Sequence, residues 1–372
     1  MPLGDPLVWK AMVFSIAAIF LITFLTWWLY CSSLQPPVQV RPTPSPRLAG
    51  WFATLLAVSG LFLIIGGLWD GSMHIMTGEI PAGADFLWPP HLMIYGSFLL
   101  SFIVAEVALA LIAVPSWRKG IRDPRRWVRS NPYLGAVALA SMYTMAAIPG
   151  DALWHEIIGI DLTAWSPPHV LLGMMSAAVM ASAVGLLVQS RTAMQRVGWA
   201  NTAIMVLLVL MLKQMLLIGV SEWEWPVEMS SLQRPIWLYP LVGGGMAFFT
   251  LILGKHLMPY RWTATAIALL YYFMHLMTML GLQLTDNIVP TFPLLFILGA
   301  FLLDVMPWQH LTSRYYRLLI PAIAFTTGYE ILGLPLLTLR THLAPFGAVD
   351  IVLAIVLMVA TSLALMPAAK RT

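Results

Sequence analysis

The sequence predicts an all-α protein, a polytopic transmembrane helical bundle of about 11 spans. The first observation is composition. Of the 372 residues, 60% are hydrophobic and only 10% are charged, whereas a soluble domain carries about 25% charged residues. The second is that apolar runs of roughly 20 residues, the length that crosses a bilayer, recur along the whole chain. The third is that Lys and Arg gather in alternate loops, as the positive-inside rule predicts.

Each expected span is one apolar run between polar or turn-forming segments. The first run has no strongly basic segment before it and no clear small-residue cleavage site, so we expect a permanent span and not a cleaved signal peptide. The Pro-rich segment 35–47 follows it as an extended linker. In chain order the expected spans are 8–32, 49–69, 90–114, 133–154, 168–189, 198–220, 237–254, 263–283, 290–306, 316–339 and 350–366.

The charges in the loops orient the chain. The loop 117–129 and the terminal residues 370–371 are basic, whereas the loops 70–85, 151–161 and 222–228 are acidic. Because basic loops stay in the cytoplasm, we expect the N-terminus outside and the C-terminus in the cytoplasm, in a prokaryotic plasma membrane. The net charge of +4 follows from this topology, so no nucleic-acid partner is expected. The expected partners are membrane lipid and either other membrane subunits or further copies of the chain.

One pattern occurs twice on the expected outer side. It reads "LWDGSMHIMTGEIPAGADFLWPPHLMIYGS" over 68–97 and "GDALWHEIIGIDLTAWSPPH" over 150–169. Each copy has an Asp, a His four residues later, and a Pro-Pro-His at the start of the next span. The six Asp and His residues are Asp70, His74 and His91 in the first copy and Asp151, His155 and His169 in the second. The shared order and side predict a parallel helix–loop–helix repeat. We therefore expect a membrane bundle over 1–190 that carries both copies, and further transmembrane helices of unassigned role over 191–372.

Helix geometry predicts that the polar residues of each copy converge. Residues four apart share a helix face, so each Asp points with the His that follows it. In the second copy Ser166 suits the N-cap and the prolines suit the first turn. His169 then starts a helix, where the dipole helps to keep its imidazole neutral and able to ligate a metal. Two imidazoles and one carboxylate leave coordination positions open, which suits catalytic zinc, non-haem iron or copper. Glu156 and Asp161 are placed to orient the imidazoles.

The second copy resembles the copper-binding stretch of the third subunit of the copper membrane monooxygenases, the particulate methane and ammonia monooxygenases. The matching residues, in order, are Asp151, Trp154, His155, Asp161, Pro167 and His169. The resemblance covers roughly residues 50–190. It implies that Asp151, His155 and His169 are copper ligands and, by analogy, that the first copy forms another site. The chain departs from the family in having Asp in both motifs and in its larger number of spans, and the family enzymes also need two other subunits.

These observations favour a metal-binding membrane protein and leave catalysis open. The first hypothesis is a copper-dependent oxidoreductase, a monooxygenase-like subunit that acts on a small or hydrophobic substrate at the outer face. The second is a metal-binding or transport protein without chemistry. The third is a zinc-dependent membrane hydrolase, in which Glu156 would act as general base on a metal-bound water. Haem held by a pair of histidines ranks lowest, because haem normally takes histidines deeper in the bilayer.

A few ionisable residues fall inside the expected spans, where charge is costly and marks function by default. Glu106 lies in the third span, Lys213 in the sixth and Glu330 in the tenth. Lys213 and Glu330 fall at similar depth, so they predict either a structural ion pair or part of a proton path to the outer site. The histidines outside the repeat are interpreted as structural residues; they are His256, His275, His310 and His342.

Overall fold

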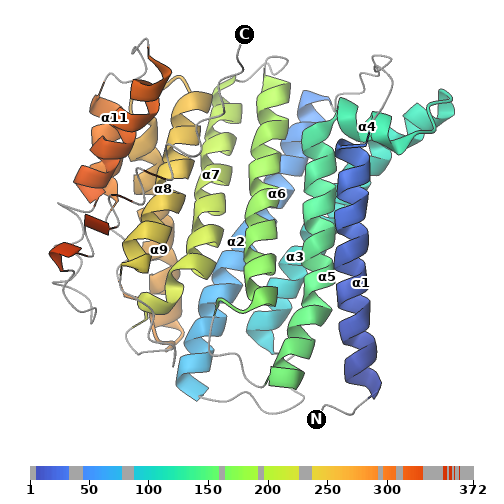
Figure 1. Ribbon diagram of the computed structural model, residues 1–372, viewed down its shortest axis with the longest axis horizontal. Coiled ribbons are helices and arrows are strands. Elements are labelled where there is room, and N and C mark those ends of the chain that lie inside the picture. The colour runs from blue at the N-terminus through green and yellow to red at the C-terminus, as the bar shows by residue number, and fades with distance from the viewer. Residues whose placement is uncertain are drawn as a thin grey trace. The chain divides into compact units, whose positions relative to one another are not determined.

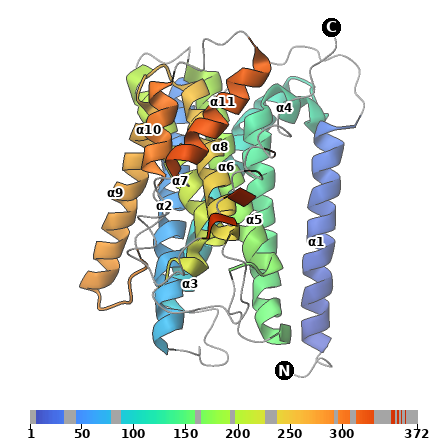
Figure 2. The same ribbon diagram turned by 60° about the vertical axis from the view of Figure 1, so that its left-hand side comes forward.

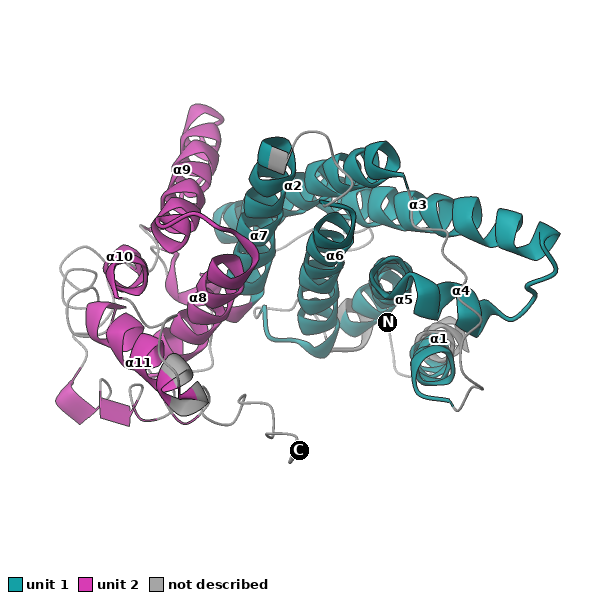
Figure 3. Cartoon of the chain, turned by 90° about the horizontal axis from the view of Figure 1, so that it is seen from above, with its two compact units in different colours: residues 1–218 teal, residues 219–372 magenta. Residues whose placement is uncertain are grey.

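The computed structural model describes residues 6–32, 45–77, 88–158, 164–191, 197–225, 237–291, 296–306 and 313–329, with a few isolated residues between 347 and 360. Throughout these residues the regular structure is helical, and no strand occurs in them (Figures 1 and 2). Within the same residues, seven helices are long and apolar enough to cross a membrane. The chain is therefore an all-helical protein whose long apolar helices suit a membrane. It divides into two compact units, residues 1–218 and 219–372 (Figure 3).

The seven long helices correspond to seven of the expected spans. They are Pro46–Thr77, Pro89–Arg118, Pro132–Trp154, Pro167–Arg191, Gly198–Gly219, Leu238–Leu257 and Thr263–Leu284. The other four expected spans are not among these seven helices, although the run 8–32 is helical from Pro6 to Tyr30. The runs 8–32 and 316–339 include the shorter apolar helices Ile16–Tyr30 and Leu319–Tyr329. The run 290–306 contains a helix of nine residues, and most of 350–366 lies outside the described residues.

Proline and polar caps set where the helices of the first unit begin. Proline stands at the first position of six of them, where its missing N–H costs nothing and its fixed φ suits the helix. At three of these starts a side chain also accepts a backbone N–H. Leu48 N donates to Ser45 Oγ at 3.3 Å. Arg125 N donates to Asp123 Oδ1 at 3.0 Å, and His169 N donates to Ser166 Oγ at 3.4 Å, so the predicted N-cap is confirmed. The helices are α1 (Pro6–Tyr30), α2 (Pro46–Thr77), α3 (Pro89–Arg118), α4 (Pro124–Ser130), α5 (Pro132–Ile158), α6 (Pro167–Arg191) and α7 (Val197–Gly219).

Four long helices of the first unit pack in a closed arrangement. α2 packs against α3 and α6, and α5 packs against the same two helices (Figure 3). The α2–α3 and α5–α6 hairpins therefore pack directly against each other, and α1 packs on the outside of α5. Gly185 lets α6 approach α5 closely, because a Cβ there would lie only 2.2 Å from Cδ1 of Tyr133. These contacts place both copies of the sequence pattern in one four-helix unit.

The second unit is a separate helical unit that follows α7. Its helices are η2 (Ser221–Trp223), α8 (Leu238–Leu257), α9 (Thr263–Leu284), α10 (Ile297–Val305) and α11 (Arg314–Thr326). α9 packs on α8 and α10, and α11 packs on the same two helices. The core between them is aromatic, with Tyr239, Tyr271, Phe296, Phe325 and Tyr329 all at most 1% exposed.

A buried ion pair joins three helices of the second unit. Asp304, near the end of α10, lies 2.9 Å from the Lys255 ammonium of α8, and their side chains are 0% and 7% exposed. The same carboxylate accepts hydrogen bonds from the backbone N–H groups of Ala264 and Thr265 at the start of α9, at 3.2 and 2.7 Å. Lys255 also donates to the Arg261 carbonyl at 2.8 Å. Every charge in this network has a partner, which is the condition for tolerating buried charge.

The expected domain boundary and the expected charges inside the spans can be compared with the structure. The expected division after residue 190 followed the sequence pattern, whereas the division into units at 218/219 follows packing and places α7 in the first unit. Lys213 is buried on α7, and its expected partner Glu330 lies outside the described residues. Glu106 is half-buried on α3, and its Oε1 is shielded from solvent without a hydrogen-bond partner.

Candidate metal centre

The last turns of α2 carry the first two residues of the candidate site. The apolar run was expected to end at residue 69, but the helix continues to Thr77, so Asp70 and His74 stand on it one turn apart. Residues at this spacing share a helix face, and His74 Nε2 lies 3.5 Å from Asp70 Oδ1. The side chains of Asp70 and His74 are 21% and 17% exposed. The helix itself therefore presents a carboxylate and an imidazole together.

The third residue comes from the start of α3, which a close approach of two helices brings to Asp70. Trp88 precedes the helix, and two prolines occupy its first positions before His91. One turn inward from Asp70, Gly66 lies so close to α3 that a Cβ would stand 3.0 Å from Ile94 Cγ1 and 3.2 Å from Ile94 N. The absence of a side chain at Gly66 is what allows α2 and α3 to meet at this separation. As a result His91 Nε2 lies 2.9 Å from Asp70 Oδ1.

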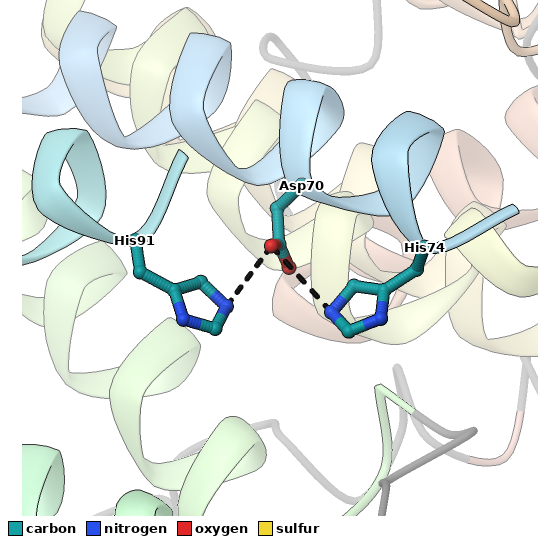
Figure 4. Close-up of side chains that lie close together, drawn as sticks. All are labelled: Asp70, His74 and His91. Carbon is teal, nitrogen blue, oxygen red and sulfur yellow. Dashed lines mark ion pairs between the residues drawn. The ribbon is translucent and has the colours of Figure 1, made fainter. Parts of the chain in front are cut away.

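The three side chains converge as a possible donor set for one ion. Figure 4 shows the two imidazoles on opposite sides of the Asp70 carboxylate, each directing a nitrogen at it. One donor atom from each residue lies within 4.8 Å of the other two, and the two rings are 6.2 Å apart and tilted by 44°. Two ligands of one metal stand up to about 4 Å apart when the bonds are about 2.0–2.2 Å long. The donors would therefore need to contract by less than about 1 Å around an ion.

The contacts of the Asp70 carboxylate are compatible with a bound ion. Its Oδ1 is shielded from solvent and has no hydrogen-bond partner, although the nitrogens of His91 and His74 lie 2.9 and 3.5 Å away. These contacts therefore lack the alignment of hydrogen bonds. A buried polar atom without a partner is rare and costly, and an ordered water or an ion at the site would explain it.

The second copy repeats the central contact of the first. Asp151 of α5 and His169 of α6 are brought together, with His169 Nε2 3.1 Å from Asp151 Oδ1; the His169 side chain is 26% exposed and that of Asp151 is 8% exposed. The matching pair in the first copy is 2.9 Å apart. His155 belongs to α5, but its side chain lies outside the described residues, as does that of Glu156; all of Asp161 lies outside them too. The expected convergence of three ligands in this copy therefore stays a prediction.

An apolar layer lies one to two helical turns inward of both Asp–His pairs. All four helices contribute to it, and its buried members are Leu63, Phe98, Ala147, Ile148 and Leu172. Partly buried side chains that include Tyr95 and Met145 pack against it. Both Asp–His pairs therefore lie next to an apolar cluster in the core of the four-helix unit.

Two residues of the site were not predicted. Tyr95 packs beside His91 with ring centroids 5.7 Å apart, and its position four residues after His91 was an available signal because it shares that helix face. Gly66 is part of "IIGGLWD", but a glycine pair does not reveal which neighbour approaches it. The structure supplies that neighbour, Ile94.

Comparison with known proteins adds no relative. No protein-family model, no curated protein and no solved structure matches the chain.

Proposed function

We propose that the chain is an integral membrane metalloprotein in which Asp70, His74 and His91 bind one transition-metal ion at the outer face. The observation that carries the proposal is the convergence of these three donors around a carboxylate oxygen that has no hydrogen-bond partner. A structural cluster would satisfy this oxygen with a hydrogen bond. Bound metal would satisfy it once the donors contract by less than about 1 Å around the ion.

The donor set suits a reactive centre with open positions. Imidazole binds copper, zinc and iron, and a carboxylate completes a set of three. We propose copper, with zinc or iron as outcomes of the test, because the repeated motif resembles the copper-binding stretch of the copper membrane monooxygenases. Bound copper would supply one-electron chemistry at an accessible site. His74 and Asp70 remain partly exposed, so a small molecule can reach the donors.

The apolar layer supports an oxidoreductase that acts on a small hydrophobic substrate, rather than a metal permease. A transported ion would need polar partners on its way inward. Here an apolar cluster that includes Leu63, Phe98 and Ile148 lies directly inward of both pairs. The same layer would hold an apolar substrate next to the metal and keep water from it. The chain's part in the reaction is thus to bind the metal, to leave positions open on it and to seat the substrate.

The two hairpins are proposed to be copies of one parallel repeat. The α2–α3 and α5–α6 hairpins carry the same Asp–His contact and make reciprocal contacts with each other, α2 with α6 and α3 with α5. We therefore propose a second metal site at Asp151 and His169, with His155 as the third ligand.

Metal analysis of the purified chain tests the proposal. The full chain is purified in detergent without chelators, and its metal content is measured by mass spectrometry alongside two variants. His74→Ala should lower the bound metal by about one ion per chain, because two donors alone bind weakly. His256→Ala is the matched control, since His256 is exposed at the end of α8, and it should keep the wild-type content. Equal metal content in wild type and His74→Ala would exclude the site.

A further inference from the structure

The corner between α3 and α5 concentrates positive charge at the end of unit 1 that is expected to face the cytoplasm. Residues 118–129 include six Arg or Lys and one Asp. They form the end of α3, the turn that follows it and most of α4, which packs against α1, α3 and α5. Two of the six cations have partners within the protein, and three others are exposed.

The two internal cations fix α4 in place. Arg125 forms an ion pair with Asp123 at 3.0 Å. Arg129 donates to the carbonyl oxygen of Leu29 at 3.0 Å and to that of Ser32, at the end of α1. The negative charge of Asp123 is therefore balanced by Arg125 and does not neutralise the remaining cations.

Three of the remaining cations form an exposed cluster. Arg118, Lys119 and Arg122 are all exposed, at the last residue of α3 and in the turn that follows it. Arginine and lysine side chains bind phosphate oxygens, arginine through two parallel hydrogen bonds. This cluster matches the charge of a phosphate group in the headgroup region of a membrane.

An exposed apolar stripe leads directly to the basic cluster. Ile103, Val107, Leu111 and Val114 lie three or four residues apart on α3 and are 49–50% exposed, so they share one face of the helix. Trp117 continues the stripe and is 60% exposed. Tryptophan is typical of the boundary between hydrocarbon and headgroups, and its ring lies 6.3 Å from that of Trp127. The stripe therefore runs from the expected bilayer interior to the expected headgroup level.

We propose that this surface binds an anionic phospholipid of the cytoplasmic leaflet. The phosphate lies at Arg118, Lys119 and Arg122, and one acyl chain follows the stripe from Trp117 toward Ile103. The occupant is a lipid and not free phosphate, because the apolar stripe and the basic cluster form one continuous surface on α3. The site is independent of the proposed metal centre, which belongs to the opposite end of α3.

Native mass spectrometry of the full chain in detergent tests the headgroup contacts. Phosphatidylglycerol is the anionic probe, and phosphatidylcholine is the zwitterionic one. The variant Arg118→Gln/Arg122→Gln removes two charges from the cluster. The control Arg47→Gln/Arg261→Gln removes two arginines that are exposed elsewhere. Each basic side chain near an anionic headgroup contributes about fivefold to binding, so the first variant should bind phosphatidylglycerol about 25-fold more weakly. The control should bind it as wild type does.

Two further binding measurements distinguish a lipid from other occupants. Trp117→Ala should weaken the binding of both long-chain lipids to a similar degree, because it removes apolar contact and no charge. Glycerol phosphate, which has the headgroup charge without acyl chains, should not compete with phosphatidylglycerol at equal concentration. The proposal is overturned if wild type binds the two lipids equally, if the control variant loses as much affinity as the first variant, or if glycerol phosphate competes.

Discussion

Replacing Gly66 with Ala tests how the contact between α2 and α3 sets the geometry of the metal centre. The new Cβ would stand 3.0 Å from Ile94 Cγ1, 3.2 Å from Ile94 N and 3.3 Å from Met93 Cβ. Carbon atoms pack best at about 3.5–4.0 Å, so the helices must separate by roughly 0.5 Å. Since Asp70 is on α2 and His91 is on α3, the separation acts directly on their 2.9 Å contact.

The expected loss of metal affinity follows from this displacement. Metal–ligand bonds lie within about 0.2 Å of their usual lengths, so the side chains would have to make up the displacement that the methyl group imposes. We expect Gly66→Ala to weaken metal binding by about 10- to 100-fold, the range seen when groups that position a metal ligand are lost. Overpacking costs about 1–3 kcal/mol, and the better helix propensity of Ala returns about 0.5–1 kcal/mol. A net loss of stability on the order of 1 kcal/mol should accompany the weaker binding.

Gly96→Ala is the matched control for this substitution. Gly96 is on α3, and a Cβ there would meet nothing within 4 Å, so Ala should leave metal affinity unchanged and raise stability slightly. Affinity is measured by competition with a chromophoric chelator, and stability by thermal unfolding in detergent. Wild-type metal affinity in Gly66→Ala would refute the view that this helix contact sets the site.

Three further predictions concern stability. Asp304→Ala should lower the free energy of unfolding by about 3–5 kcal/mol, the range for breaking a buried pair, because Lys255 is left buried without its counter-charge. Equilibrium unfolding measures this loss, and a loss under about 1 kcal/mol contradicts the prediction. Hydrogen bonds from Arg125 lower the pKa of the Asp123 carboxyl below its ordinary value of 3.8. The Asp123 carboxylate therefore stabilises the fold above pH 3.8, and this contribution is lost as the pH falls through the lower pKa of the folded state. Unfolding of wild type and Asp123→Asn across this range checks the sign, since the variant should show a smaller acid-induced loss. Ser166→Ala should cost about 1 kcal/mol as the loss of an N-cap, and an unchanged melting temperature would contradict the cap.

The sequence predicts the long helices well because the cause of each is local. An apolar run of sufficient length must span the membrane as a helix, and proline marks six helix starts in the first unit. The short helix α4 was not predicted, because three of its seven residues are arginines and the segment carries no apolar period. The apolar run alone ends at residue 69, but the Asp70–His74 spacing already required the helix to continue to His74, and α2 ends at Thr77.

The candidate site was predictable as far as spacing determines contact. The Asp-x3-His spacing predicts Asp70 beside His74, and the repeated Pro-Pro-His predicts a histidine at the start of the next helix. The Lys255–Asp304 pair could not be predicted, because its partners are 49 residues apart on different helices and no periodicity links them. The same reason explains why Gly66 was not assigned a role. Its importance depends on which residue of α3 approaches it.

X-ray absorption at the copper edge tests whether Asp70, His74 and His91 bind the metal. The chain is loaded with copper in a His169→Ala background, so that the second Asp–His pair contributes no complete site. The account predicts two imidazole nitrogens and one carboxylate oxygen at about 2.0–2.2 Å, and the further replacement His74→Ala should remove one imidazole from the spectrum. A bound copper without imidazole scattering, or a spectrum that His74→Ala leaves unchanged, would contradict a metal centre built from Asp70, His74 and His91.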